Sequence, residues 1–338
     1  MTVMPGNQVK IEDVAEAAGV SVATVSRALR DLPYVATSTR ERVLAVAKEL
    51  SYVANPTASR LAAGRIGTGT VAVLVPMFDS WYFAKIVSGI EASLTEANVD
   101  VLLFAVRNDA ERQNFLAGRG AWWQRGDALI MISVQLSDSE ACSLREIGSR
   151  IVTVGSETEA FSSVSIDERS AAASAAQHFI ESGHTRIGVL ADDLSSLSHR
   201  VAILRLEGFR ERLAQHGHSL DPELILSAGF SIDGGRECMA RLLDADEPPT
   251  AVFAMSDEMA LGALDELRRR GLSAPEDVAV IGFDDNDVSV LFGLTTVRQR
   301  VDTIGATAGR LVLRAMNDRD QAPEHVVAPT ELILRSTA

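Results

Sequence analysis

Hydroxyl and guanidinium side chains lie close together in one short segment near the N-terminus. Ser21, Thr24 and Ser26 can donate hydrogen bonds to phosphate oxygens, which fix the position of a protein along a nucleic acid. The guanidinium of Arg27 can donate two parallel hydrogen bonds to O6 and N7 of a guanine. These side chains could therefore contact DNA if a secondary-structure element presented them on one exposed face.

Two short helices are predicted to position these side chains. Apolar residues recur at helical spacing in both, first at Ile11, Val14, Ala15 and Ala18, and then at Val25, Ala28 and Leu29. Gly19 can end the first helix with a positive φ, and Ser21 can cap the second. Val22 and Ala23 lie on the free face, where they offer only apolar contact, for example to a thymine methyl group. The pattern indicates a helix-turn-helix, and a helical hairpin that caps a larger core is the alternative.

The net charge of the chain is −14, but its sign changes along the sequence. Residues 1–65 contain eight basic and six acidic residues, which gives +2 and leaves −16 for the remainder. An acidic remainder repels DNA, so the basic residues of the N-terminal segment must make any DNA contact. Because that segment is only weakly basic, we expect one copy of it to bind poorly.

The composition argues against several classes of protein. No apolar run reaches the roughly 18 residues of a membrane span, and the segment MTVMPGNQVK lacks the apolar stretch of a secretory signal. The two cysteines, Cys142 and Cys238, give neither a disulfide framework nor a metal-binding spacing. We expect a cytoplasmic protein with no membrane partner, no metal site and no cofactor.

Hydrophobic patterns predict the remaining elements. A third helix is expected from about Thr37 to Leu50, with Val43, Leu44, Ala47 and Leu50 buried, and a short helix over 55–63 precedes a glycine-rich joint. Buried strands follow at 70–76, 99–106, 127–133, 151–155, 163–167, 185–191, 250–255 and 277–283. Helices lie between most of them, notably at 83–97, 168–182, 200–216, 231–243 and 257–270. This alternation predicts two α/β lobes with doubly wound parallel sheets.

The segment DVAEAAGVSVATVSRAL is similar to the N-terminal DNA-binding motif of the LacI/GalR (lactose-repressor) family of bacterial transcription factors. The similarity continues through residues 34–65 and, more loosely, to the C-terminus. It implies a helix-turn-helix DNA-binding domain at 8–54, a hinge helix and linker at 55–69, and an effector-binding and dimerisation domain at 70–338. The last of these would have a two-lobed, periplasmic-binding-protein-like α/β fold. The implied DNA-binding residues are Lys10, Ser21, Val22, Ala23, Thr24, Ser26, Arg27, Asn55, Ala58 and Leu61.

The same resemblance gives Leu61 a particular role. In the family, the hinge helices of two subunits pair in the minor groove, and a leucine from each inserts into the central base step and kinks the DNA. Such a wedge costs about a few kcal/mol of base unstacking, which the contacts made by the bent DNA offset. The alternative is that Leu61 packs inside its own subunit.

The C-terminal part resembles the family's effector-binding core, which implies a ligand site between the lobes. The implied effector-binding residues are Ser80, Trp81, Tyr82, Ser133, Asp167, Arg205, Asp257, Asp284 and Gln299. Carboxylates, arginine and amides can hydrogen-bond the vicinal hydroxyls of a sugar, and aromatic rings can stack on its faces. The segment Ser80-Trp81-Tyr82-Phe83 replaces the family's usual Asn-Pro-Phe-Phe. Trp81 is the preferred stacking residue, and Phe83 is expected in the core.

We therefore expect a homodimeric repressor that binds a palindromic double-stranded operator and responds to a small-molecule effector, a sugar or an oligosaccharide. A sugar-binding protein, or an enzyme with an accessory helical head, is the alternative. The sequence contains no P-loop, no G-x-S-x-G, no metal-ligand spacing and no G-x-G-x-x-G after a strand, which disfavours the enzyme. Because no heptad pattern follows the last predicted elements, we expect a dimer rather than a tetramer.

Overall fold

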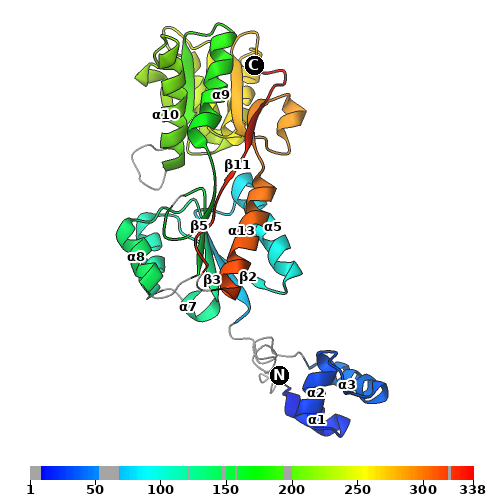
Figure 1. Cartoon of the computed structure of the whole chain (residues 1–338). Helices are drawn as coiled ribbons and strands as arrows, with labels where there is room; N and C mark the ends of the chain where they lie inside the picture. The colour runs from blue at the N-terminus through cyan, green and yellow to red at the C-terminus, as the bar shows by residue number, and fades with distance from the viewer. Residues whose placement is uncertain are drawn as a thin grey trace, which may run out of the picture. The chain divides into compact units, whose positions relative to one another are not determined.

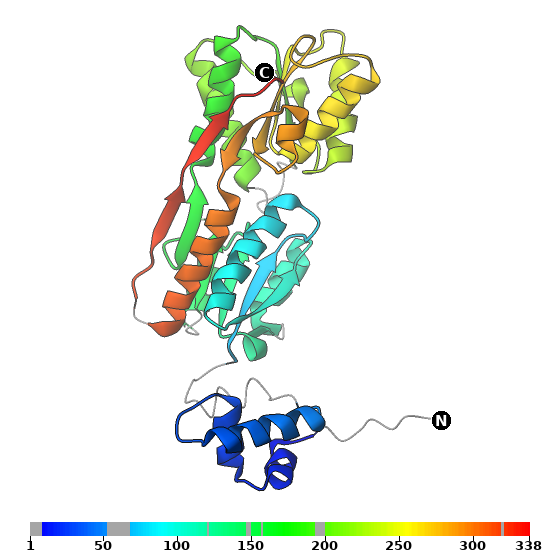
Figure 2. The same cartoon turned by 90° about the vertical axis from the view of Figure 1, so that its right-hand side faces the viewer.

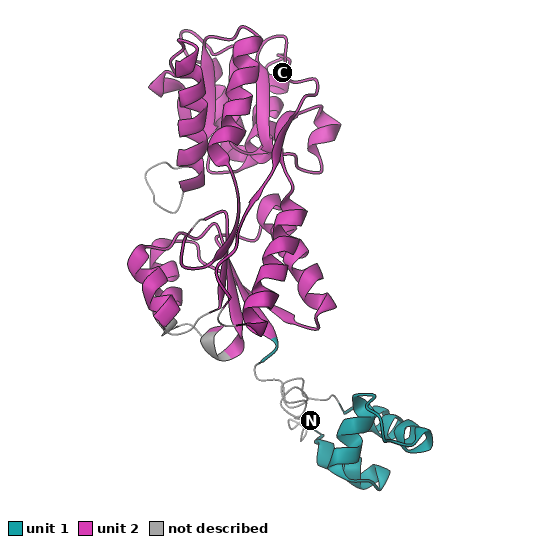
Figure 3. Cartoon of the chain, in the orientation of Figure 1, with its two compact units in different colours: residues 1–69 teal, residues 70–338 magenta. Residues whose placement is uncertain are grey.

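The computed structural model describes residues 9–52, 68–119, 122–146, 150–156, 158–192, 200–318 and 321–338. The chain divides into two compact units, residues 1–69 and 70–338 (Figure 3). The predicted hinge residues Asn55, Ala58 and Leu61 lie outside the described residues. The minor-groove wedge and the boundaries of the hinge therefore stay predictions.

Helices form the described part of the first unit: α1 (Ile11–Ala18), α2 (Val22–Leu29) and α3 (Thr37–Glu49). Their shared core contains the fully buried side chains of Val14, Val25 and Val43, which confirms the predicted helix faces. The prediction that Leu44 is buried is wrong, because this residue is 46% exposed. Successive helix residues differ by about 100°, so a helix that buries positions 43 and 47 turns position 44 outward.

The corner between α1 and α2 has the geometry that the sequence predicts. Gly19 ends α1 with a φ of 62°, and its N–H donates to the carbonyl of Glu16. The Oγ of Ser21 then accepts a hydrogen bond from the N–H of Thr24 at 3.2 Å. This bond satisfies one of the free donors in the first turn of α2, and it fixes the residue at which α2 begins.

Two sheets, each of six strands, form the framework of the second unit (Figure 1). The first has the order β11-β5-β4-β3-β1-β2 and is parallel throughout. Its strands are β1 (Thr70–Val75), β2 (Asp100–Ala105), β3 (Ala128–Ile132), β4 (Ile151–Val154), β5 (Ser162–Ile166) and β11 (His325–Ala328). We call this sheet and its helices the N lobe.

The second sheet has the order β12-β10-β9-β8-β6-β7, in which only β12 runs antiparallel to its neighbour. Its strands are β6 (Ile187–Ala191), β7 (Ile225–Ser227), β8 (Ala251–Ala254), β9 (Ala279–Asp284), β10 (Thr295–Gln299) and β12 (Thr330–Ile333). We call this sheet and its helices the C lobe. The predicted pair of doubly wound α/β lobes is confirmed.

Helices cover both sheets. Those of the N lobe are α5 (Trp81–Glu96), α6 (Asp109–Asn114), α7 (Trp122–Arg125), α8 (Asp138–Glu146) and α13 (Val301–Asn317), with a π-helical turn at η1 (Phe115–Arg119). Figures 1 and 2 show α5 and α13 side by side. Their backbones approach closely at Gly89 and Gly305, where an added Cβ would collide with the carbonyl oxygens of Asp302 and Ile86 respectively.

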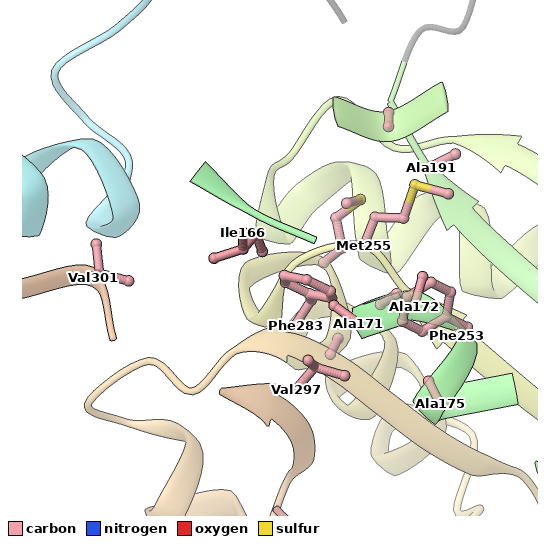
Figure 4. Close-up of a cluster of buried hydrophobic side chains, with 14 of the residues drawn as sticks. Ile166, Ala171, Ala172, Ala175, Ala191, Phe253, Met255, Phe283, Val297 and Val301 are labelled. Carbon is pink, nitrogen blue, oxygen red and sulfur yellow. The ribbon is translucent and has the colours of Figure 1, made fainter. Parts of the chain in front are cut away.

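The helices of the C lobe pack in pairs. They are α9 (Glu168–Glu181) against α10 (Arg200–Gln215), and α11 (Ile232–Leu243) against α12 (Asp257–Arg269), with short 3-10 turns at η3 (Pro222–Leu224) and η4 (Ser289–Phe292). Phe253, Phe283 and Val297 project from the neighbouring strands β8, β9 and β10 into one core with Ala171 of α9 (Figure 4). Within the described ranges, no helix combines the length and the apolar character needed to cross a bilayer.

The chain passes between the two lobes at three described connections. These join β5 to α9 at residue 167, β10 to α13 at residue 300, and β11 to β12 at residue 329. Residues at the ends of β5 and β10 therefore belong to the boundary of the two lobes. Because the carboxyl ends of parallel strands collect ligand-binding residues, this boundary is where a ligand site is expected.

Candidate functional site

The second helix of the first unit presents a small exposed face. Val22 is 40% exposed, and Ala23 and Arg27 are exposed beside it, whereas Val25 and Ala28 are buried. The predicted division of α2 into a core face and a free face is therefore confirmed. A helix with one arginine and small side chains on its free face can enter a DNA major groove.

The polar residues near this face also stabilise the ends of the helices. The hydroxyls of Ser21 and Thr24 lie 2.9 Å apart, and the backbone N–H of Lys10 donates to Asp13 at 2.7 Å. The backbone carbonyl of Ser26, which is half-buried, accepts from Arg30. These bonds hold α1 and α2 in shape, and the predicted contacts of these residues with DNA stay a prediction.

In the second unit, side chains from both lobes meet in what we call the interlobe cluster. Its members are Tyr82 and Ser133 of the N lobe, and Glu168, Arg205, Asp284 and Gln299 of the C lobe and its connections. The four residues from the C-lobe side are between 4% and 9% exposed. The structure thus brings together five of the nine predicted effector-binding residues: Tyr82, Ser133, Arg205, Asp284 and Gln299.

Arg205 is the one cation of this cluster, and its bonds are with the protein itself. Its Nε donates to Glu168 at 2.7 Å, and its Nη1 donates to the carbonyl of Met255 at 2.6 Å. The guanidinium also lies over the ring of Phe283, 3.5 Å from the centroid, which is a favourable cation–π position. A buried ion pair held in this way is rigid, and removal of either partner leaves an uncompensated charge.

Asp284 ends β9 with an unusual backbone. Its φ is 123° and that of Asp285 is 58°, a region that residues other than glycine rarely adopt. Asp285 is held there by Arg298 and Arg335, each at 2.6 Å, while Oδ1 of Asp284 accepts from Gln299 at 2.6 Å. Strained backbones of this kind gather at functional sites, where surrounding bonds enforce them.

Burial raises the pKa values of three groups in the interlobe cluster. It raises the pKa of Asp284 well above the usual range, although Arg205 opposes the shift. It also raises the pKa of Glu168 and the pKa of Tyr82, whose hydroxyl shares a hydrogen bond with Ser133. The cluster therefore resists a further negative charge, because it already contains two carboxyl groups and one guanidinium.

Two predicted effector-binding residues have other roles in the structure. Asp257 is fully buried, and its carboxylate accepts from the N–H of Asn286 at 2.7 Å and from the hydroxyls of Ser289 and Thr296, each at 2.5 Å. Both of its oxygens are thus committed to joining α12, η4 and β10. We therefore leave Asp257 out of the proposed ligand site.

Asp167 lies at the predicted crossover, but its carboxylate caps α9. It accepts from the N–H of Ser170 at 3.0 Å and from its hydroxyl at 2.6 Å, and these bonds lower the pKa of Asp167. The next residue, Glu168, is the one that reaches Arg205. The sequence prediction missed Glu168, because an acidic residue in the first turn of a helix has an adequate local explanation.

Ser80 and Trp81 contact carboxylates of the C lobe. The Oγ of Ser80 donates to Glu258 at 3.3 Å, and the N–H of Trp81 donates to the same carboxylate at 3.1 Å. The indole N–H of Trp81 donates to Asp287 at 3.2 Å. The sequence prediction missed Glu258 and Asp287, and the stacking role of Trp81 stays a prediction.

Two known protein families match parts of this chain. The family described as "Bacterial regulatory proteins, lacI family" matches residues 10–55, and "Periplasmic binding protein-like domain" matches residues 176–338. Catabolite control protein A of Priestia megaterium is 32% identical over 97% of this chain and 99% of its own length. The chain belongs to the LacI family.

Solved structures of LacI-family proteins resemble the whole chain. The "transcriptional regulator CelR-cellobiose complex" is 32% identical, covers 98% of this chain and all of its own, and has a TM-score of 0.70. The lac repressor dimer bound to operator and the anti-inducer ONPF is 25% identical, covers 98% and 99%, and has a TM-score of 0.83. This LacI-family chain is therefore a DNA-binding transcriptional regulator with an effector-binding domain, and its relatives are regulators rather than enzymes.

Proposed function

We propose that this LacI-family regulator represses transcription as a homodimer on a palindromic operator, and that an uncharged sugar bound at the interlobe cluster controls its DNA affinity. The observation that carries this proposal is the cluster itself, because Tyr82 and Ser133 come from one lobe and Arg205 and Asp284 from the other. A ligand that bonds to both lobes favours one arrangement of them. Such a differential affinity is what an allosteric effector requires.

The free face of α2 supports the DNA-binding half of the proposal. Arg27 is exposed and able to reach both acceptors of a guanine, while Val22 and Ala23 beside it can contact thymine methyl groups. With a single long polar side chain on this face, one helix reads few base pairs. Two copies on an inverted repeat would double the contact and raise the effective affinity.

Exposed apolar side chains on η4 support self-association. Val290, Leu291 and Phe292 are all exposed, and Leu291 is 79% exposed. A monomeric surface seldom presents adjacent apolar side chains of this size, whereas an interface between subunits buries them. The related lac repressor structure is described as a dimer on its operator, which also supports a dimer here.

The charges of the interlobe cluster favour an uncharged ligand. Arg205 already pairs with the carboxylate of Glu168 and donates to a backbone carbonyl, so little of its positive charge can neutralise a phosphate. The carboxyl groups of Asp284 and Glu168, whose pKa values burial raises, provide no positive charge to balance an anion in this poorly solvated place. The hydroxyls of a sugar can instead donate to these carboxyl groups, and the related CelR structure is described as a cellobiose complex.

A thermal-shift screen tests the effector. Ligands that bind only the native state raise the melting temperature, by an amount that grows with ligand concentration. We expect a shift with at least one uncharged mono- or disaccharide, cellobiose included, and none with the phosphate ester of that sugar or with purines. A shift with sugar phosphates or purines alone would contradict the assignment of an uncharged effector.

Selection from a random DNA pool tests the operator. We expect the recovered sequences to share an inverted repeat, and light scattering to show a dimer at the protein concentration used. Leu291→Asp should give a monomer that no longer recovers the repeat, because a charge cannot be buried at an apolar interface. Recovery of single, unrepeated sites by a stable monomer would overturn the proposed mechanism.

A further inference from the structure

The first turn of α5, in the N lobe, is held by a carboxylate of the C lobe. Ser80 is the N-cap residue of α5, but its side chain makes no capping bond within the helix. Glu258, from the start of α12, accepts instead from the Ser80 hydroxyl at 3.3 Å and from the N–H of Trp81 at 3.1 Å. Since the first N–H groups of a helix lack partners and favour negative charge, Glu258 caps α5 from the other lobe.

A second carboxylate contacts the same turn from outside. Asp287 accepts from the indole N–H of Trp81 at 3.2 Å and pairs with Lys85 at 2.7 Å. The side chain of Asp287 is 63% exposed, so solvent screens this pair and it contributes little. The bonds of Glu258 are half-buried, and burial raises the pKa of that carboxyl. Glu258 is therefore the stronger of the two contacts between the lobes.

The position of this contact matters because the next residue is Tyr82. Its hydroxyl reaches Ser133 inside the interlobe cluster, whose C-lobe members are nearly inaccessible to solvent. A sugar can reach Arg205 and Asp284 only if the lobes move apart. That movement must separate the first turn of α5 from Glu258.

We propose that Glu258 is a positioning residue that holds the two lobes together in the absence of effector, and so controls access to the interlobe cluster. It does so through Ser80 and Trp81 rather than through the ligand. Its bonds are part of the free-energy difference between the closed and open arrangements of the lobes, and a ligand must overcome that difference to enter. The proposal rests on the proposed effector site, but its first test needs neither effector nor DNA.

A spin-label distance measurement in the full-length protein tests the proposal. One label is attached to the native Cys142, which is exposed on α8 of the N lobe, and the other to Arg210→Cys, exposed on α10 of the C lobe. Cys238 is buried and should not react. Labelled protein is diluted into unlabelled protein, so that only distances within one subunit are recorded.

We expect Glu258→Ala to raise the ratio of long to short interlobe distances by about 3- to 30-fold, the range for a lost helix-end carboxylate with two hydrogen bonds. The matched control is Asp265→Ala, which removes from the same helix a carboxylate that pairs with Arg268 of that helix. The control should keep the wild-type distances. An unchanged distribution in a folded Glu258→Ala protein would overturn the proposal.

Ser80→Ala provides a second variant on the other side of the same contact. It should lengthen the distances less than Glu258→Ala, and the double variant should resemble Glu258→Ala alone, because both changes break one contact. Strictly additive effects would show that the two residues act separately, which also overturns the proposal. A failed effector screen with lengthened distances would instead refute only the proposed sugar.

Discussion

The free face of α2 and the interlobe cluster differ in burial and in charge. The free face of α2 is exposed and carries one charged side chain, that of Arg27. The buried core residues of α2 are separate from the exposed residues that would contact DNA. The interlobe cluster is buried and charged, and Arg205 serves the fold as well as the site. Substitutions on the free face of α2 should therefore change DNA binding and leave stability alone, whereas substitutions in the cluster should change both ligand binding and stability.

The largest expected effect is that of Arg205→Ala on stability. The change removes the partner of Glu168, which is 9% exposed, and a buried charge without its partner costs about 3–5 kcal/mol. Denaturant-induced unfolding of the full chain at neutral pH measures the loss. The control Arg210→Ala, exposed on the same helix, should stay within about 0.5 kcal/mol of wild type.

The double variant Arg205→Ala/Glu168→Gln sharpens this result. It removes the unpaired charge, so it should recover a large part of the lost stability. If Arg205→Ala alone costs less than about 1 kcal/mol, the ion pair does not support the C lobe, and the contrast with α2 fails.

Asp284→Asn should separate binding from stability within the cluster. The amide keeps an oxygen that can accept from Gln299, so the fold should be retained. A sugar hydroxyl that loses its buried acceptor at this position costs about 1–3 kcal/mol, so affinity for the selected sugar should fall roughly 5- to 150-fold. Calorimetric titration measures this affinity, and an unchanged value would exclude Asp284 from the site.

The pH dependence of the same variant follows from the raised pKa of Asp284. The folded state holds this proton more tightly than the unfolded state does, so wild-type stability is lost as pH rises from about 4 through the raised pKa. The amide that replaces the carboxyl group in the variant cannot titrate. The melting temperature of Asp284→Asn minus that of the wild type should therefore become more positive between pH 4 and neutrality, and a difference that becomes more negative would contradict the burial of this charge.

Arg27→Ala tests the exposed side of the comparison. It should weaken operator binding by about 1–3 kcal/mol and relax the preference at one base pair, with no loss of stability. Binding isotherms on the selected operator and on single-base variants measure both effects. Arg42→Ala, an exposed arginine on α3, is the matched control and should weaken all sequences equally.

The sequence predicted best what depends on local pattern. The faces of α1 and α2, the cap at Ser21 and eight of the strands follow from periodicity and turn residues, although β2, predicted as buried, has only exposed and half-buried residues. It missed β10, which lies inside its sheet but has the sequence TTVRQ, and it missed β7, β11 and β12, which border their sheets and have only exposed and half-buried positions. Short edge strands of this kind have no continuous apolar run to reveal them.

Two pairs of neighbouring acidic residues show what the sequence prediction could not determine. In each pair, Asp167 with Glu168 and Asp257 with Glu258, the sequence selected the aspartate. In the structure, both aspartates accept hydrogen bonds that stabilise helix starts and nearby loops. The glutamates instead contact distant partners: Glu168 contacts Arg205, and Glu258 contacts the first turn of α5. The choice depends on tertiary partners far along the chain, which a local pattern does not contain.

The smallest expected effect, that of Val22→Ala, decides how α2 reads DNA. Val22 is 40% exposed and can contact DNA only through its methyl groups. Its substitution by alanine should therefore reduce the operator-binding free energy by less than about 1 kcal/mol, which is less than about fivefold in affinity. The loss should appear only at operator positions with a thymine, and uracil in place of that thymine should remove it. If Val22→Ala costs as much as Arg27→Ala, α2 reads chiefly by apolar contact, and Arg27 serves to hold phosphate rather than to select a base.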